Sequence, residues 1–391
     1  MGKQTWTILD SQHGVYLDSL TISGGELPGS AASMRVTKRR LHGGPCDGVD
    51  VVEIGNGEMS VTVVPTRGMG IWKAESGPVK LGWISPTRGP VHPALVPIFD
   101  PSGLGWLDGF DELLVRCGLE SNGAPEFKED GTLRYPLHGR IANLPAEHVQ
   151  VAVDDETGEV SVLGRVRETR LFFAKLQLTT RISLLPGRSE FTVTDTVTNL
   201  AGVPGEMELL YHINFGAPLL GPQSRVVLPI REMAPRDAVA AAEIDRWDVY
   251  GPGVPGKPET VYFFELSSHP SGATSALLHN AESTHGAGVA FNVRELPCFT
   301  LWKNEQPECD GYVTGLEPAV NFPNVRSFEK ARGRVVTLEP GQSRSFSVTV
   351  RAYRSSSEVE NARAEVLELQ QGVLPRVSRK PNPAWSAGVE S

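Results

Sequence analysis

The sequence predicts an all-β protein built mainly from antiparallel strands. Short runs of alternating apolar and polar residues recur along the chain. Glycine (41 residues) and proline (30 residues) are plentiful, which is typical of many turns between short strands. No repeat of fixed period and no break in composition divides the 391 residues. We therefore expect one large β-sandwich domain over residues 1–355, followed by a C-terminal helix and loose tail over 356–391.

Composition narrows the classes of partner. Hydrophobic residues (40%) suffice for a full core, and charged residues (21%) are at an ordinary level, which argues against disorder. The net charge is −9 and no Lys/Arg block is present, so we expect no nucleic-acid partner. A neutral or hydroxyl-rich ligand fits the composition better. The protein is expected to act as a monomer or homodimer.

The expected cellular compartment is inferred from the targeting and membrane segments that the sequence lacks. The N-terminus has no apolar signal core, and no run of 18 apolar residues occurs, so we expect a cytoplasmic protein with no membrane partner. Four cysteines are scattered without CxxC spacing. Idle thiols are the expected state of such cysteines in a reducing compartment.

The N-terminal third is predicted to contain three early strands and a long functional segment. Residues 1–35 are expected to pack on the domain as an extension, and 36–41 form a strand. Two strands follow within 50–64 around an Asn-Gly turn. Residues 82–137 lack periodicity but are rich in aromatic side chains, which favours an ordered, functional segment.

The middle of the chain has the strongest strand pattern. Alternation predicts strands within 160–166, 171–184 and 191–197. They lead directly into the apolar strand 208–216, which delivers a histidine and an asparagine just before a glycine.

The C-terminal third is predicted to complete the sandwich. A short helical segment is expected at 238–244, and further strands at 261–266, 276–279, 289–293, 298–303 and 311–317. Strands 335–338 and 345–353, with Pro340-Gly341 as their turn, are expected to close the sheet. An amphipathic helix over 357–371 takes Ser357 as its N-cap, and the tail from Gly372 is expected to be loose.

Two residues stand out as an acid and a base. In strand 208–216 the side chains of Glu208, Leu210, His212 and Asn214 share one face. Glu317 ends a similar apolar run. Burial lowers the pKa of a histidine and raises that of a glutamic acid, drawing both toward the neutral range that proton transfer needs. A single strand histidine is more often structural, so the argument depends on the combination.

Other candidate residues complete a small-molecule site. There is no nucleophile elbow, no phosphate-binding or dinucleotide-binding glycine pattern and no HExxH. His138, His212 and Glu317 would bind a metal ion if they converged, but we expect no metal and no other cofactor. The further candidates for site residues are Arg67, His138, Arg140, Asn214, Trp302 and Lys303.

These motifs together resemble one known family. Arg67-Gly68-Met69, Cys117-Gly118-Leu119, Leu137–Arg140, Leu210–Gly216 and Leu316–Pro318 occur in this order. In order and spacing they are similar to the galactose mutarotase (aldose 1-epimerase) superfamily, and most similar to its aldose-1-epimerase-like branch. The resemblance covers roughly residues 35–353.

The resemblance implies a β-supersandwich with few short helices and an open sugar-binding cleft. It implies that His212 is the general acid toward the ring oxygen and Glu317 the base toward the anomeric hydroxyl. His138 and Arg67 would hold and polarise the sugar. The implied activity is that of an isomerase that interconverts sugar anomers or epimers without a cofactor.

Two alternatives stay open. The same pair could serve a lyase or ketosugar epimerase by removing a C–H proton beside a carbonyl, with Arg67, His138, Lys303 or a metal stabilising the enolate. The chain could instead be a carbohydrate-binding protein without turnover, in which Trp83, Trp106 and Trp302 stack on sugar rings.

Overall fold

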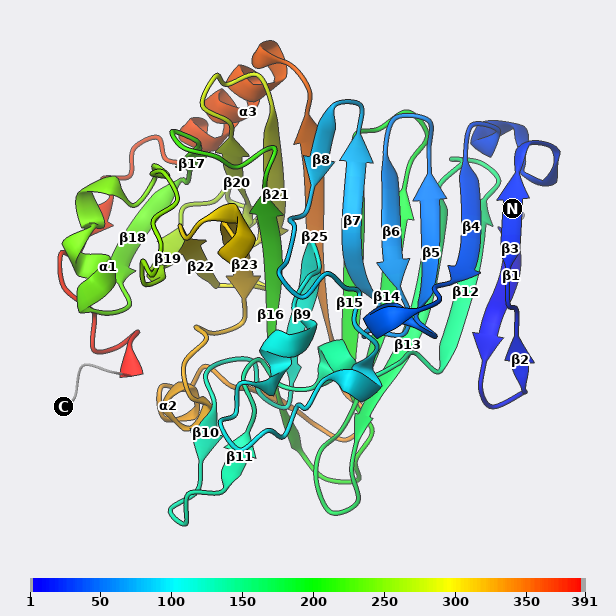
Figure 1. Cartoon of the computed structure of the whole chain (residues 1–391), viewed down its shortest axis with the longest axis horizontal. Helices are drawn as coiled ribbons and strands as arrows, with labels where there is room; N and C mark the ends of the chain where they lie inside the picture. Colours follow the sequence, from blue (N-terminus) through cyan, green and yellow to red (C-terminus); the bar gives the residue numbers. More distant parts are fainter. Residues whose placement is uncertain (1–2, 388–391) are drawn as a thin grey trace.

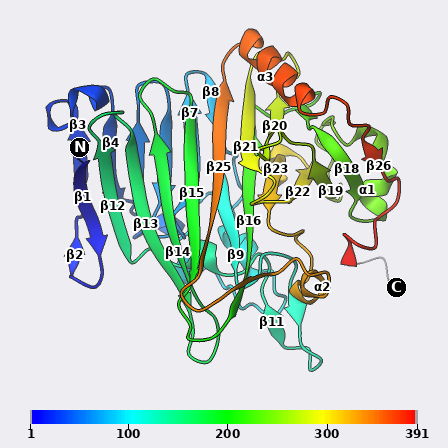
Figure 2. The ribbon, with the colours of Figure 1, turned by 180° about the vertical axis from the view of Figure 1, so that it is seen from behind.

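Two large antiparallel β-sheets lie face to face and make up most of the protein (Figures 1 and 2). The computed structural model describes residues 3–387. Helical segments are short and lie at the ends and edges of the sandwich. The predicted all-β sandwich of mainly antiparallel strands is confirmed.

The ten-stranded sheet is the one nearer the viewer in Figure 2. Its strands, in spatial order, are β17 (Arg225–Val227), β20 (Ala273–His279), β21 (Gly286–Asn292), β25 (Ser343–Tyr353), β15 (Glu190–Asn199), β14 (Lys175–Leu184), β13 (Val160–Thr169), β12 (His148–Asp154), β1 (Lys3–Asp10) and β2 (Val15–Tyr16).

The 14-stranded sheet carries the candidate site. In spatial order its strands are β26 (Arg376–Val377), β18 (Ile230–Pro235), β19 (Thr260–Leu266), β22 (Cys298–Asn304), β23 (Val313–Ala319), β16 (Gly205–Gly216), β9 (Leu114–Leu119), β7 (Gly70–Ser76), β6 (Ser60–Val64), β5 (Asp50–Gly55), β4 (Arg35–Arg40) and β3 (Leu20–Ser23). Two more strands, β24 (Val336–Leu338) and β8 (Val79–Leu81), pair with β16 and β7.

The remaining elements are short. The α-helices of the described residues are α1 (Ala238–Ala242), α2 (Arg326–Ala331) and α3 (Ser356–Glu368), and a small hairpin joins β10 (Glu126–Phe127) to β11 (Leu133–Tyr135). Single 3₁₀ turns are η1 (Gly24–Glu26), η2 (Gly29–Ala31), η3 (Gly44–Cys46), η4 (Pro93–Leu95), η5 (Gly105–Gly109), η6 (Ile141–Asn143), η7 (Ile244–Arg246) and η8 (Glu308–Asp310).

The main hydrophobic core lies between the two sheets. Alternate residues of β14 and β15, such as Leu178, Ile182, Val193 and Val197, are fully buried there. Each such side chain stabilises the fold by about 1.5–3 kcal/mol relative to exposure. Alternation in these strands was readable in the sequence because one face is buried and the other meets solvent.

A second apolar cluster covers the opposite face of the 14-stranded sheet. There Val115 of β9 and Leu210 of β16 pack against Trp106, Phe110 and Ala142 from the long segment 82–143. Strand β16 is therefore buried on both faces. The segment predicted to be ordered and functional forms a lid of side chains over the strands that carry the candidate acid and base.

Residues 3–35 contribute strands to both sheets rather than forming an extension packed on the domain. Strand β1 pairs with β12 in one sheet, and β3 pairs with β4 in the other. The main-chain N–H and C=O groups of β1 and β3 form hydrogen bonds with the neighbouring strands β12 and β4, which holds both strands in place.

Predictions for the strands, the helix and the tail at the C-terminus need correction. The two strands expected to close the sheet together, β24 and β25, do not pair with each other. β24 pairs with β16, whereas β25 lies between β15 and β21. Helix α3 begins at Ser356, because the Ser355 side chain accepts a hydrogen bond from the amide of Glu358 and so caps it.

The described part of the tail is not loose. β26 pairs in parallel with β18. Trp385 is buried against Phe322, and its carbonyl accepts a hydrogen bond from Asn324. Burying an indole gives this tail a large apolar anchor. The last four residues of the predicted tail, 388–391, lie outside the described residues.

All four cysteines are free thiols, as predicted. Within residues 3–387, no helix has the length and apolar character needed to cross a membrane.

Candidate functional site

His212 and Glu317 meet because their strands are neighbours in register. β16 pairs with β23 through Leu210–Ala319 and Ile213–Leu316, which sets His212 beside Glu317 on one face. Nε2 of His212 lies 3.2 Å from Oε1 of Glu317. Their side chains are only 5% and 2% exposed. Oε1 of Glu317 is buried and has no hydrogen-bond partner among the described residues, so this oxygen is available to bind a proton.

Gly315 makes room for this pair. A Cβ at this position would lie 2.3 Å from Oε1 of Glu317 and 3.0 Å from Cε1 of His212. Any side chain there would displace the carboxyl group or the imidazole.

Asn214 fixes which nitrogen of His212 carries a proton. The amide nitrogen of Asn214 donates to the carbonyl of Glu112 at 2.9 Å, which orients the amide group. Its Oδ1 therefore faces Nδ1 of His212, at 2.6 Å. Because Oδ1 can only accept, Nδ1 is the protonated nitrogen, and Nε2 presents its lone pair toward Glu317.

Burial moves both members of the pair toward neutrality. Desolvation lowers the pKa of His212 well below its usual value, and the nearby charge of His138 lowers it further. Desolvation likewise raises the pKa of Glu317 well above its usual value, and the charge of Glu259 adds to the rise. The uncharged form of each group is therefore favoured, with a proton on the carboxyl group and none on Nε2, and moving that one proton to Nε2 gives the ionised pair.

His138 is the third ring at this point and is held in an unusual backbone conformation. Its φ is 55°, a region that residues other than glycine seldom occupy. Nδ1 of His138 donates to the carbonyl of Asn122 at 2.9 Å, which leaves Nε2 without a proton when the ring is neutral. Desolvation lowers the pKa of His138. The ring centre lies 5.5 Å from that of His212.

Aromatic rings surround the two imidazoles. The ring centres of Phe110 and Trp302 lie 5.0 and 5.3 Å from that of His212, and Trp106 lies 4.6 Å from His138. The indole NH of Trp106 is buried without a hydrogen-bond partner. The structure thus brings together five of the candidate residues, His138, His212, Asn214, Glu317 and Trp302.

Glu259 and Arg236 flank the more exposed edge of the site. Glu259 accepts a hydrogen bond from the indole NH of Trp302 at 2.6 Å and forms an ion pair with Arg236 at 2.9 Å. The side chains of Arg236 and Glu259 are 36% and 46% exposed. This carboxylate was missed in the sequence, because an acidic residue next to a proline-rich loop has no local signature.

A buried polar network holds Asn122, the hydrogen-bond partner of His138. Glu208 accepts hydrogen bonds from the backbone amide of Asn122 and from the side chain of Asn321. The Asn122 side chain donates to the side-chain oxygen of Asn321. Desolvation raises the pKa of Glu208 to about 7. Asn122, which the sequence did not single out, is thereby fixed with its carbonyl toward His138.

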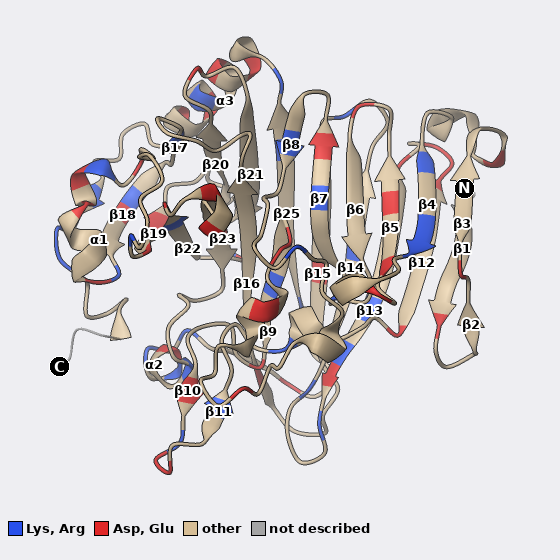
Figure 3. Cartoon of the chain, in the orientation of Figure 1, with Lys and Arg blue, Asp and Glu red and all other residues tan. Residues whose placement is uncertain are grey.

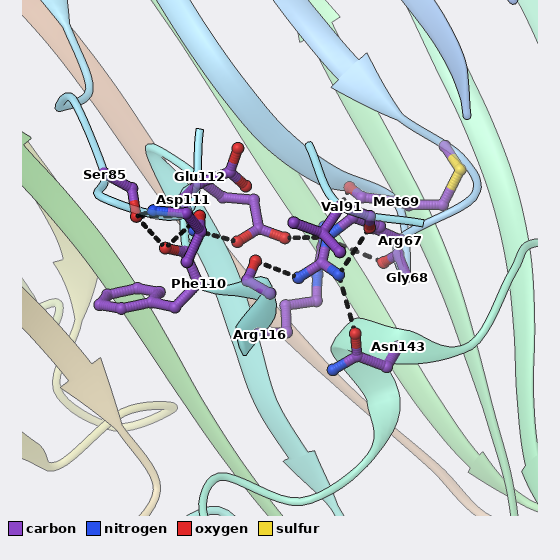
Figure 4. Close-up of polar contacts among 12 residues, drawn as sticks. Arg67, Gly68, Met69, Ser85, Val91, Phe110, Asp111, Glu112, Arg116 and Asn143 are labelled. Atoms are coloured by element: carbon purple, nitrogen blue, oxygen red, sulfur yellow. Dashed lines mark hydrogen bonds and ion pairs between the residues drawn. The ribbon is translucent and has the colours of Figure 1, made fainter. Parts of the chain in front are cut away.

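Arg67 lies outside the site and is enclosed by protein groups (Figure 4). Its guanidinium forms an ion pair with Glu112 at 2.6 Å and donates to Asn143 at 2.8 Å and to the Gly109 carbonyl at 2.7 Å. Its side chain is 0% exposed. Since the Glu112 carbonyl orients Asn214, Arg67 is connected to His212 through Glu112 and Asn214.

Lys303 and Arg140 also lie away from the pair. Lys303 pairs with Thr314, which lies three residues before Glu317 on β23. Because side chains alternate along a strand, Lys303 points to the opposite face of the sheet. Its ammonium donates to the carbonyls of Arg246 and Val249, and desolvation lowers its pKa to about 8. Arg140 lies over the ring of Phe99, beyond the turn that follows His138.

No group of three or more histidine, cysteine, aspartate or glutamate side chains with the arrangement of a metal site occurs between residues 3 and 387. His138, His212 and Glu317 are the residues that the sequence suggested as metal ligands. The atoms they leave available are Nε2 of each histidine and Oε1 of the carboxyl group.

The chain is similar to several proteins of solved structure. The chain is similar to a solved structure described as a "putative aldose 1-epimerase" from Klebsiella pneumoniae subsp. pneumoniae, with 31% identity, a TM-score of 0.93 and coverage of 97% of this chain and 99% of that one. It is similar in fold to a galactose mutarotase-like protein from Clostridium acetobutylicum, with 14% identity, a TM-score of 0.57 and coverage of 82% and 98%. For a galactose 1-epimerase from Lactobacillus acidophilus the values are 12%, 0.52, 83% and 100%.

The fold is therefore that of the galactose mutarotase-like proteins. Residues 46–352 match the model of a family described as a domain of unknown function, DUF4432, and the chain belongs to that family. No curated protein sequence matches it.

Proposed function

We propose that the protein is an isomerase of the aldose 1-epimerase type, which interconverts sugar anomers or epimers by paired proton transfer. The observation that carries the proposal is the buried contact between Nε2 of His212 and Oε1 of Glu317 at 3.2 Å. One acid and one base, side by side beneath aromatic rings, match the needs of ring opening at an anomeric centre.

The mechanism needs one proton to move in each direction. Glu317 as carboxylate takes the proton from the anomeric hydroxyl O1, while His212 as imidazolium gives its Nε2 proton to the ring oxygen O5. The C1–O5 bond breaks and a C1 carbonyl forms. Rotation about C1–C2 and the reverse transfers close the ring with the opposite configuration at C1. The ionised pair has the same net charge as the neutral pair and differs from it by one proton moved between the two groups.

The surrounding groups suit a sugar. His138 offers an unprotonated Nε2 as a hydrogen-bond acceptor for a hydroxyl group, and the indole of Trp302 offers a face on which a sugar ring can stack. The buried NH of Trp106 is a free donor. A site with these groups needs no cofactor for anomerisation.

The C–H-abstracting alternative receives less support from the contacts. It requires a cation near the developing enolate. Arg67 is enclosed by Glu112, Asn143 and backbone carbonyls, and Lys303 lies on the other face of the sheet.

Equilibration of freshly dissolved α-D-glucose, α-D-galactose and other α-aldoses tests the proposal. Anomeric ¹H NMR signals would be followed with the protein, with His212→Asn and with Glu317→Gln. Each variant is expected to lose about 10²–10⁴-fold of the acceleration, the usual contribution of one proton-transfer group. Matched controls are His269→Asn and Glu339→Gln, since both side chains are exposed.

The same samples separate the alternatives. Full activity in either site variant would refute the proposed roles. Incorporation of deuterium from D₂O at a sugar carbon would instead support the lyase or ketosugar epimerase. Binding of a sugar without any acceleration, equally strong in both variants, would support a carbohydrate-binding protein.

A further inference from the structure

A cavity separate from the candidate site lies beyond the turn at His138. It is at the end of the molecule where the β10–β11 hairpin projects (Figure 1). Its volume is about 640 Å³, within the range of small-molecule sites. Segments far apart in the sequence form its wall: the loop with Phe99, strand β11, the turn Gly139–Arg140 and the end of β13 with its following turn. His212 and Glu317 do not line it, so it is separate from the candidate acid and base.

Positive charge gathers in this cavity. Lys128, Arg134, Arg140 and Arg170 line it, and the carboxylates that line it are Glu120 and Glu168. This is a local excess of two positive charges in a chain with a net charge of −9. Figure 3 shows that basic and acidic residues are otherwise interspersed over the sheets.

Three of these cations have no ion-pair partner. Within residues 3–387, the side chains of Lys128, Arg140 and Arg170 form no ion pair or hydrogen bond, whereas Arg134 pairs with Glu126 at 3.3 Å. Longer-range attraction remains, since the charge of Arg140 opposes the rise in the pKa of Glu168 that burial causes. Hydrogen bonds from Thr132 and, to a smaller extent, the charge of Lys128 lower the pKa of Asp130. Glu168 is already engaged, since it accepts hydrogen bonds from the backbone amide of Leu119 at 2.9 Å and from that of Glu120 at 3.3 Å.

Aromatic rings hold two of the guanidinium groups in the wall. Arg140 lies over Phe99 with its Cζ 5.7 Å from the ring centre, and Arg170 lies over Phe173 at 4.1 Å. Phe99 and Phe173 are themselves 56% and 51% exposed. Stacking on a ring restricts a guanidinium to a plane with its N–H groups available. Exposed rings beside unpaired arginines are typical of a binding surface for a ligand with both an apolar face and an anionic group.

We propose that this cavity binds a small phosphate ester on a ring scaffold, such as a sugar phosphate. The phosphate group lies between Arg140 and Arg170, with Lys128 adding charge, because arginine binds phosphate oxygens in a planar, bidentate geometry. The ring scaffold lies against Phe173 and Tyr135. The site is distinct from the proposed catalytic pair and does not depend on its activity.

Position links the two sites. Gly139 and Ser121 line the cavity, and they adjoin His138 and Asn122, the residues that form the hydrogen bond beside the catalytic pair. A ligand in this cavity therefore lies against the two segments that hold His138.

Isothermal titration calorimetry of the full chain tests the proposal with three probes: glucose 6-phosphate, inorganic phosphate and glucose. Glucose 6-phosphate is expected to bind more tightly than inorganic phosphate, and both bindings should weaken as NaCl is raised, because screening reduces attraction between charges. Arg140→Gln and Arg170→Gln should each weaken the binding of glucose 6-phosphate about tenfold or more.

Two controls separate this site from the catalytic pair and from general charge. Arg188→Gln removes the same charge from an exposed position in the turn between β14 and β15 and should leave binding unchanged. The double variant His212→Asn/Glu317→Gln should bind glucose 6-phosphate as the unaltered protein does. Binding that is unaffected by Arg140→Gln and Arg170→Gln, or absent at millimolar ligand, would overturn the proposal. Equal affinity for inorganic phosphate and the ester would overturn the ring-scaffold part.

Discussion

The Nδ1 proton of His212 is set by a single side-chain amide. Asn214 accepts a hydrogen bond from Nδ1 and is in turn oriented by the Glu112 carbonyl, so Nε2 is left to face Glu317. Sequence alone placed Asn214 on the same face as His212 and gave it a role in holding the substrate. In the structure its Oδ1 holds the imidazole, because residues two apart on a strand are close enough for a side-chain hydrogen bond.

Asn214→Asp is expected to move the pH dependence of the reaction. A carboxylate at Nδ1 stabilises the imidazolium form, so the pKa of His212 should rise from its lowered value. Because His212 must be protonated to act as the general acid, the alkaline limb of the kcat profile, where that proton is lost, should move to higher pH. NMR rates of anomer exchange between pH 4 and 8 would measure this shift. An alkaline limb at the same pH in both proteins would contradict the orienting role of Asn214.

Gly315→Ala should lower the rate without removing any functional group. The added methyl would lie 2.3 Å from Oε1 of Glu317, so the carboxyl must move. A displacement of about 1 Å in a reacting group can cost about 10²-fold in rate. The matched control is Gly221→Ala, because a Cβ there meets no atom within 4 Å. Equal rates in the two variants would show that the position of Glu317 is not critical.

At the scale of elements, strands with one buried face were predictable and strands with two buried faces were less so. β13, β14 and β15 showed alternation. β9, with every residue buried, showed none and was missed inside the segment 82–137. The loop that carries Arg67 was identified from its glycines, but the contacts of Arg67 were not, because its partners come from four separate positions in the chain.

Arg67→Met is expected to destabilise the fold rather than weaken substrate binding. The substitution leaves the carboxylate of Glu112 buried without its ion-pair partner, which typically costs about 3–5 kcal/mol. The double variant Arg67→Met/Glu112→Gln removes that charge and should recover part of the loss. Urea unfolding measures both. Unchanged stability together with a raised KM would instead place Arg67 in contact with the substrate.

At the scale of the whole molecule, the sequence predicted a single sandwich and the order of most strands but not their spatial neighbours. β25 lies between β15 and β21, and β24 joins β16, although the chain connects β24 directly to β25. Such pairings depend on which long loops close, and no local pattern encodes that. Glu259 was missed for the same reason. It lies 43 residues from Trp302 in the sequence, so no local pattern shows that the two side chains form a hydrogen bond.

One buried ion pair joins the two sheets across the main core. Arg116 of β9 donates to Asp195 of β15 at 3.0 Å, and to Thr180 of β14 at 2.7 Å. Tyr211 of β16, next to His212, also donates to Asp195, at 2.9 Å. This network ties the strand that carries the candidate acid to the opposite sheet.

Asp195→Asn should therefore be among the most destabilising single substitutions in the core. It leaves the guanidinium of Arg116 buried without a counter-charge, at a typical cost of about 3–5 kcal/mol in unfolding free energy. Tyr211→Phe removes one hydrogen bond and leaves the ion pair in place, so it should cost only about 1 kcal/mol. Urea unfolding of both variants checks the difference. If both lose the same small amount, then the ion pair does not hold the sheets together, and β16 is positioned by apolar packing alone.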